Sequence, residues 1–146
     1  KECPRSQGKE TIVSYLPSVP AWYLSTVEET PEGPRPHVRP FSFAMMQDGD
    51  IQFCTATTKD CYREMAANPS VELTAWKSGA GWVILRGKAN LTDTADARTR
   101  EEGFKHMVAL GEDWASADDE RLTFFTIEEA EAWICDIDGS WNPVQL

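Results

Sequence analysis

The dipeptide Asp48-Gly49 constrains the fold of this chain more than any other local feature. It separates two segments rich in apolar residues, 36–46 and 51–55, and Asp-Gly readily adopts the left-handed backbone that a two-residue β-hairpin turn requires. A second turn, the Gly-rich stretch 78–81, separates two further segments of β character. Turns this short join antiparallel strands, so we expect a mainly antiparallel sheet.

The remaining elements follow from hydrophobic periodicity and from turn residues. In chain order we predict a helix at 9–16, strands at 21–27, 36–46 and 51–55, a helix at 58–68, strands at 71–77 and 82–91, a helix capped by 92–94 that runs to 110, and a strand at 122–127 that continues through 130–137. Residues 28–34 are expected to form a polar loop, and the residues after 138–139 a short tail. Six or so strands of this length can close into a small barrel whose ends the helices cover. The 146 residues suit one domain, 1–146, with one core.

The charge of the chain argues against one class of partner. It carries 24 acidic and 14 basic residues, a net charge of −10, whereas general nucleic-acid binders gain affinity through Lys and Arg. We therefore expect no nucleic-acid partner, and any anionic ligand must be held by a few local cations and backbone amides. No apolar run approaches the roughly 20 residues that a membrane-spanning helix requires, so we also expect no membrane partner.

The four cysteines are Cys3, Cys54, Cys61 and Cys135, and they include no C-x-x-C pair. Zinc sites usually contain such closely spaced ligands, so no metal site is predicted. We interpret the cysteines as reduced thiols, with Cys54 and Cys135 packed in strands as small core residues. Because the first five residues lack the apolar core of a signal peptide, we expect a cytoplasmic protein.

The strongest chemical signal lies at residues 53–60, where a predicted strand gives way to a predicted helix. Thr55, Thr57 and Thr58 end the strand, Lys59 follows, and the helix begins directly afterwards. The first N–H groups of a helix have no intrahelical partner, and the positive end of the helix dipole favours anions. Threonine hydroxyls and an ammonium group at this point would complete a phosphate site. A threonine-rich helix cap beside an exposed lysine explains the same residues equally well.

A second signal lies in the strand predicted at 36–46. Strict alternation places Arg39, Phe41 and Phe43 on one face of the strand, and Val38 and Pro40 on the other. An arginine among aromatic side chains needs solvent or an anion, and Pro40 indicates an edge strand or a bulge with free backbone groups. An edge arginine paired with a carboxylate is the alternative interpretation.

Five segments in this order and spacing resemble the FMN-binding split-barrel family that includes pyridoxamine 5′-phosphate oxidase. They are 21–27, 36–43, 51–59, 68–73 and 81–89. The resemblance implies a mainly β fold, a six-stranded antiparallel split β-barrel with flanking helices. It also implies a homodimer with FMN at the subunit interface.

The resemblance further implies which residues would bind FMN. Arg39 and Lys59 match the positions that contact the phosphate, and Thr58 matches a hydroxyl beside it. Thr55 matches a threonine near the isoalloxazine ring, and Trp82 matches a residue that reaches the cofactor from the partner subunit. The full predicted set is Arg39, Pro40, Phe41, Thr55, Thr57, Thr58, Lys59 and Trp82.

The chain departs from the oxidase in ways that bear on its activity. The stretch between Thr55 and Lys59 is shorter, Ala44 replaces a second basic residue, and residues 133–146 do not resemble the substrate-binding tail. The resemblance therefore carries over the FMN site and not the pyridoxamine 5′-phosphate activity. Trp141 is a further candidate flavin neighbour.

The function predicted from the sequence is that of an FMN-dependent oxidoreductase acting on an unidentified small molecule. Catalytic residues cannot be assigned, because the sequence shows no acid–base pair and the flavin itself would carry the electrons. The alternatives are a non-catalytic flavin or haem carrier or sensor, with His37 or His106 as the haem ligand, and a deazaflavin-dependent reductase.

Overall fold

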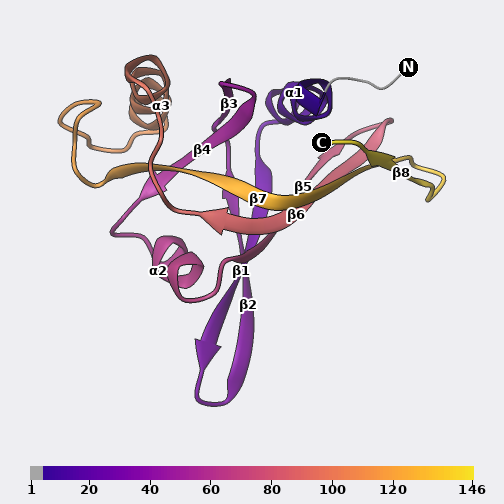
Figure 1. Ribbon diagram of the computed structural model, residues 1–146, viewed down its shortest axis with the longest axis horizontal. Helices are drawn as coiled ribbons and strands as arrows, with labels where there is room; N and C mark the ends of the chain where they lie inside the picture. The colour runs from indigo at the N-terminus through magenta and orange to yellow at the C-terminus, as the bar shows by residue number, and fades with distance from the viewer. Residues whose placement is uncertain (1–4) are drawn as a thin grey trace.

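The computed structural model describes residues 5–146, which form eight β-strands and three α-helices (Figure 1). Cys3 lies outside the described residues. In chain order the elements are α1 (Arg5–Tyr15), the 3-10 turn η1 (Leu16–Ser18), β1 (Trp22–Thr30), β2 (Gly33–Phe41), β3 (Ala44–Gln47), β4 (Asp50–Ala56), α2 (Asp60–Ala67), β5 (Ser70–Lys77), β6 (Gly81–Asn90), α3 (Ala97–Ala109), β7 (Leu122–Cys135) and β8 (Trp141–Val144).

All strand pairs are antiparallel, and the sheet follows the order β2-β1-β5-β6-β7-β4-β3, with β8 paired to β7. The two ends of this order, β2 and β3, are consecutive in the chain and are separated by Ser42 and Phe43 alone. A sheet whose two edges are joined by two residues must curl round on itself, which produces a split barrel. The predicted mainly β split barrel with flanking helices is therefore confirmed, and its sheet has eight strands where six were expected.

The segment predicted as one strand at 36–46 is interrupted at Ser42 and Phe43, because its two halves pair with different strands. Trp22 of β1 pairs with Phe41, whereas Phe53 of β4 pairs with Ala44. At this interruption the chain passes from one end of the strand order, β2, to the other, β3.

Two further segments differ from the prediction. The stretch 28–34 is not a loop, because β1 and β2 continue to the pair Thr30 and Gly33 and form a long hairpin that projects from the barrel (Figure 1). The tail forms β8, whose Pro143 is tolerated because β8 is an outer strand that pairs only with β7.

The long helix begins later than predicted. Asp96 is the residue that caps α3, since its carboxylate accepts the Thr99 amide at 2.8 Å. Residues 92–94 form the preceding loop instead, where the Asp93 carboxylate accepts the Ala95 amide at 3.0 Å and pairs with Arg100 at 2.6 Å. These local bonds compete with an earlier helix start.

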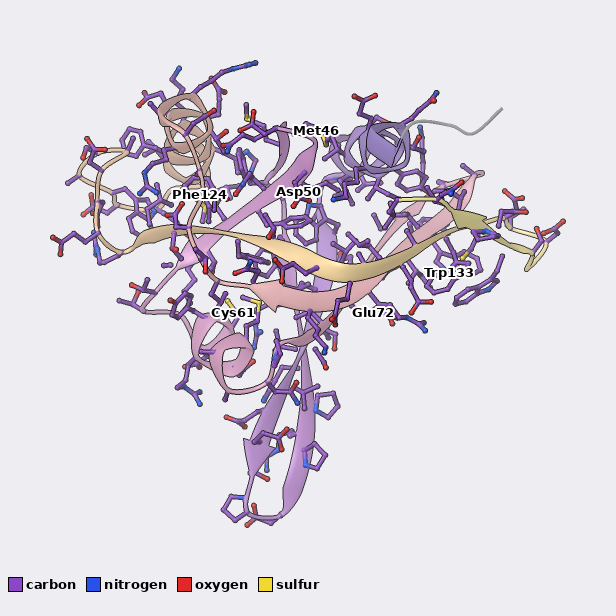
Figure 2. All side chains as sticks on the ribbon, in the orientation of Figure 1. Met46, Asp50, Cys61, Glu72, Phe124 and Trp133 are labelled. Carbon is purple, nitrogen blue, oxygen red and sulfur yellow. The ribbon has the colours of Figure 1, made fainter. Side chains whose placement is uncertain are left out.

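The barrel interior is packed with apolar side chains, and a second apolar cluster lies beneath α3. The barrel cluster includes Trp22, Leu24, Phe53, Leu73 and Phe125, while the second cluster contains Phe43, Cys54, Met107, Leu122 and Phe124. Figure 2 shows Phe124 beside α3 and Trp133 on the opposite side of the molecule, toward β8.

Helix α3 lies very close to the sheet because residue 103 is a glycine. A Cβ atom there would come 2.5 Å from Cζ of Phe124. This close approach brings the last turn of α3, with His106 and Met107, to the interruption between β2 and β3, where Phe43 contacts the His106 ring. None of the helices within residues 5–146 combines the length and apolar character that crossing a bilayer requires.

Candidate functional site

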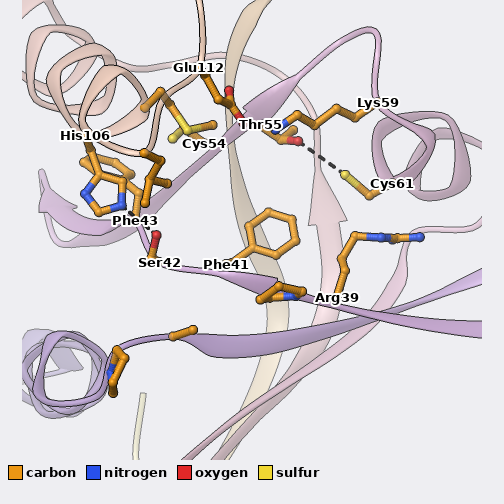
Figure 3. Close-up of a pocket in the computed structure, with 15 residues that line it drawn as sticks. Arg39, Phe41, Ser42, Phe43, Cys54, Thr55, Lys59, Cys61, His106 and Glu112 are labelled. Atoms are coloured by element: carbon orange, nitrogen blue, oxygen red, sulfur yellow. Dashed lines mark hydrogen bonds and ion pairs between the residues drawn. The ribbon is translucent and has the colours of Figure 1, made fainter.

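A cavity of about 310 Å³ lies between the end of β2, the end of β4, and the last turn of α3 (Figure 3). Its lining residues come from distant parts of the chain: Pro20, Ala21, Arg39, Pro40, Phe41, Ser42, Phe43, Cys54, Thr55, Lys59, Cys61, His106, Met107, Leu110 and Glu112. Five of the eight residues predicted as cofactor ligands therefore converge on one cavity, namely Arg39, Pro40, Phe41, Thr55 and Lys59.

The strand face predicted for Arg39 is the face that the structure shows. Within β2, Arg39 and Phe41 are half-buried and alternate with the exposed Val38 and Pro40, although Pro40 also borders the cavity. Pro40 belongs to β2, which is an edge strand of the sheet order, as its missing backbone donor indicated.

The Arg39 guanidinium donates hydrogen bonds to two buried polar side chains, those of Glu64 and Thr26. Its Nη2 donates to Oε1 of Glu64 at 2.8 Å, and its Nη1 donates to Oγ1 of Thr26 at 3.0 Å. The Thr26 hydroxyl in turn donates to the same Glu64 oxygen at 2.6 Å. Arg39 is thus paired with a carboxylate, as the alternative interpretation expected. It also borders the cavity, as the ligand interpretation expected.

The sequence revealed neither Glu64 nor Thr26 as a member of this network. The buried residues of α2 are Cys61, Glu64 and Met65, so this carboxylate lies among apolar side chains. Burial pushes the pKa of Glu64 upward, but the hydrogen bonds from Thr26 and Arg39 and the charge of Arg39 outweigh it, so the pKa lies below its ordinary value. The carboxylate is therefore charged and compensated, which explains how it can be buried.

Lys59, at the N-cap of α2, is paired with a second carboxylate. Its Nζ lies 2.6 Å from Oε1 of Glu112, which follows the end of α3. The other Glu112 oxygen, Oε2, accepts the Trp114 indole N–H at 2.7 Å. Glu112 also lines the cavity, and the sequence gave no signal for it because it lies 53 residues from Lys59.

The three threonines of the predicted phosphate loop occupy different positions. Thr55 is buried, lines the cavity, and shares a 3.3 Å hydrogen bond with the Cys61 thiol. Thr57 and Thr58 are exposed, do not line the cavity, and form the turn between β4 and α2. The Thr57 and Lys59 amides already donate to the Arg121 and Ala56 carbonyls, so these two donors are used within the protein.

The opposite end of the cavity contains a serine and a histidine in contact. Oγ of Ser42 lies 2.7 Å from Nε2 of His106, and the Phe43 ring packs against the imidazole at 5.7 Å between centroids. Burial lowers the pKa of His106, so the ring is neutral near pH 7. The pair can present either a hydroxyl donor or an oxygen acceptor to a ligand, depending on which atom carries the shared proton. The sequence did not reveal it, because the two residues lie 64 positions apart.

The thiols within residues 5–146 are buried and free. Cys54 and Cys61 line the cavity. Burial, which Glu112 reinforces and Lys59 opposes, raises the pKa of Cys54 to about 12. This thiol stays protonated at neutral pH and is not a nucleophile.

Trp82 and Trp141 lie outside the cavity of this single chain. Both pair with Cys135, Trp82 from β6 and Trp141 from β8, at the end of the sheet remote from α3 (Figure 1). Trp82 was predicted to reach the cofactor bound to a partner subunit, so its place in a single chain does not test that prediction.

One cluster outside the cavity could offer ligand atoms to a metal ion. Glu28, His37 and Glu64 place such atoms within 4.8 Å of one another. Arginines already neutralise the carboxylates, with Arg39 2.8 Å from Glu64 and Arg63 3.5 Å from Glu28. The cluster is an ion-pair network between α2 and the β1–β2 hairpin.

Comparison with known proteins agrees with the fold. A family model described as pyridoxamine 5′-phosphate oxidase matches residues 9–134. A NimC/NimA family protein from Clostridium acetobutylicum is similar in structure, with 24% identity, 94% of each chain covered, and a TM-score of 0.76. A pyridoxamine 5′-phosphate oxidase-related, FMN-binding protein from Nostoc punctiforme has 12% identity, covers 100% of this chain and 98% of its own, and gives a TM-score of 0.58.

A structure named F420 reductase is also similar, with 22% identity, 80% of this chain and 93% of that chain covered, and a TM-score of 0.53. Among curated proteins, no match to the sequence was found.

Proposed function

This chain belongs to the pyridoxamine 5′-phosphate oxidase family, and we propose that it is an FMN-dependent oxidoreductase acting on a small molecule. The observation that carries the proposal is the convergence of Arg39 and Lys59, from different elements, on one cavity whose other walls are largely apolar. Each cation is paired with a carboxylate, Arg39 with Glu64 and Lys59 with Glu112, and both still border the cavity, where they could donate to an anionic ligand.

The donor set fits the phosphate of FMN. Arg39 offers a planar guanidinium at the edge of β2, and Lys59 offers an ammonium group at the N-cap of α2. Both groups form charge-assisted hydrogen bonds with phosphate oxygens in many proteins. Thr55 and the backbone around Pro40 complete the polar rim.

The apolar part of the cavity fits a flat ring. Phe41, Phe43, Met107 and Leu110 provide aromatic and aliphatic surface beside the polar end. Bound FMN would supply the hydride or electron chemistry, while the chain orients the ring and limits access of water. The Ser42–His106 pair provides the one acid–base contact on this wall among the described residues, and it can hold or pass a proton at the Ser42 hydroxyl.

We also propose that the protein acts as a homodimer, with the ring site completed by the partner chain. The cavity of one chain is small for a whole flavin mononucleotide and opens on one side. Trp82, which the family resemblance assigns to the partner's contribution, would approach the cofactor only across such an interface. Sedimentation at several protein concentrations would test this.

Two other functions are compatible with the same cavity, a flavin carrier or sensor and a deazaflavin-dependent reductase. A carrier or sensor would bind the flavin without turnover. A deazaflavin reductase would follow the similar structure named F420 reductase, and Arg39 and Lys59 would suit the phosphate of that cofactor as well.

A redox cycle followed by absorbance tests the proposed activity. The FMN-loaded protein is mixed anaerobically with NADH or NADPH, and a quinone or nitroaromatic acceptor is then added. Bleaching of the flavin bands by the nicotinamide and their rapid return with the acceptor support an oxidoreductase. Tight binding of FMN with no bleaching by either donor and no reoxidation of dithionite-reduced flavin by the acceptor supports a carrier and contradicts the proposal.

A further inference from the structure

We propose that Glu112 competes with the phosphate of FMN for Lys59 and thereby sets how strongly the site discriminates between FMN and riboflavin. This inference rests on the proposed function, since it assumes that a flavin phosphate binds beside Lys59. It assigns a specificity role to a residue that follows the end of α3.

The geometry shows that Lys59 is occupied by Glu112. The Nζ to Oε1 distance of 2.6 Å is short for an ammonium–carboxylate contact, and both residues line the same cavity. A phosphate oxygen that binds Lys59 at ordinary hydrogen-bond distance must either take the place of this carboxylate oxygen or lie directly beside it. Two anionic groups at such a separation repel each other.

Glu112 is fixed by other contacts, so it remains near Lys59 when a ligand arrives. Its Oε2 accepts the Trp114 indole N–H at 2.7 Å, and its backbone amide donates to the Met107 carbonyl at 3.1 Å. The Trp114 ring is covered by the Arg121 guanidinium, 4.8 Å from its centroid. These contacts anchor Glu112 independently of Lys59.

Lys59 is the more exposed member of the pair. Its side chain is 43% exposed, compared with 30% for Glu112, and its long flexible stem can redirect the ammonium group toward a new anion. Half-exposed ion pairs contribute little to stability, so exchange of one partner for another is inexpensive. The free energy that Lys59 contributes to phosphate binding is therefore the difference between its attraction to the phosphate and its attraction to Glu112.

Riboflavin makes the same ring contacts and lacks the phosphate, so the competition affects FMN alone. Removing the Glu112 charge should strengthen FMN binding and leave riboflavin binding unchanged. Asp113 provides a matched control, because Asp113→Asn changes the net charge by the same amount at a neighbouring exposed residue that does not line the cavity.

The experiment measures the dissociation constants of FMN and riboflavin by fluorescence quenching for the wild type, Glu112→Gln and Asp113→Asn. We expect Glu112→Gln to raise FMN affinity by roughly threefold to fivefold, with riboflavin affinity and the Asp113→Asn values close to wild type. Thermal melting of the ligand-free proteins checks that each variant is folded, and Glu112→Ala serves as a second variant if the amide perturbs the loop.

The outcomes separate this inference from the proposed function. FMN binding that is unchanged or weaker in folded Glu112→Gln overturns the inference. Weaker binding would instead assign Glu112 to holding Lys59 in place. An equal gain in Asp113→Asn overturns it as well, because the effect is then one of net charge. A wild-type protein that binds neither flavin contradicts the proposed function itself, and the inference with it.

Discussion

The cavity contains two cations that are each paired with a carboxylate, but the surroundings of the two pairs differ. In the Arg39–Glu64 pair the side chains are 26% and 2% exposed, and Thr26 donates to the same carboxylate. In the Lys59–Glu112 pair they are 43% and 30% exposed. A buried carboxylate that loses its cation is left as an uncompensated charge, so the pair persists. In a half-exposed pair water can solvate both groups, so the cation can bind another anion instead. The first pair therefore fixes a guanidinium in position, and the second leaves an ammonium group available to a ligand.

The largest expected effect comes from breaking the buried pair. Glu64→Ala leaves the Arg39 guanidinium and the Thr26 hydroxyl without their shared acceptor and opens space beneath α2. We expect a loss of about 3 kcal/mol in the free energy of unfolding, measured by urea denaturation. Glu112→Ala, the matched change in the exposed pair, should cost less than about 1 kcal/mol. Equal losses in the two variants would show that burial does not distinguish the pairs.

The second prediction concerns cofactor binding. Lys59→Ala should reduce FMN affinity about tenfold, because one charge-assisted hydrogen bond to the phosphate is lost and Glu112 then faces the phosphate uncompensated. Riboflavin affinity and the urea midpoint should change little. An unchanged FMN dissociation constant in the folded variant, measured by fluorescence quenching, would remove Lys59 from the phosphate site.

The third and smallest effect is on the pH dependence of stability. The pKa of Glu64 lies below its ordinary value of 4.5 in the folded protein, so this group contributes stability above its unfolded pKa. That contribution is lost as the pH falls through the lowered folded pKa. Glu64→Gln should therefore flatten the acid side of the wild-type profile of unfolding free energy, by about 1.4 kcal/mol for each unit of pKa difference. Parallel profiles for the two proteins below pH 4.5 would contradict the direction of this shift.

The sequence predicted the parts of the fold that depend on neighbouring residues. Asp48 and Gly49 both adopt positive φ angles, 50° and 79°, as the hairpin turn requires. Pro40 indicated an edge strand, and the alternation from Val38 to Phe41 assigned the correct face of β2 to Arg39. In each case the information lies within a few residues of the position predicted.

The parts that could not be predicted depend on contacts between distant residues. Glu64 was not among the residues predicted for the site, because nothing near it in the chain indicates that Arg39 and Thr26 will compensate its charge. Ser42 and His106 meet only after α3 packs closely over Phe124 at Gly103. The same holds for Glu112, so the sequence indicated the cations of the cavity and not the groups that hold them.

The most direct test of the account is the absorbance spectrum of the purified protein, before and after addition of FMN, with the released cofactor identified by its mass. The account predicts a yellow protein with two flavin bands, either as purified or after FMN is added, that releases FMN on denaturation. A colourless protein that also fails to bind added FMN would contradict the central claim that this cavity is a flavin phosphate site.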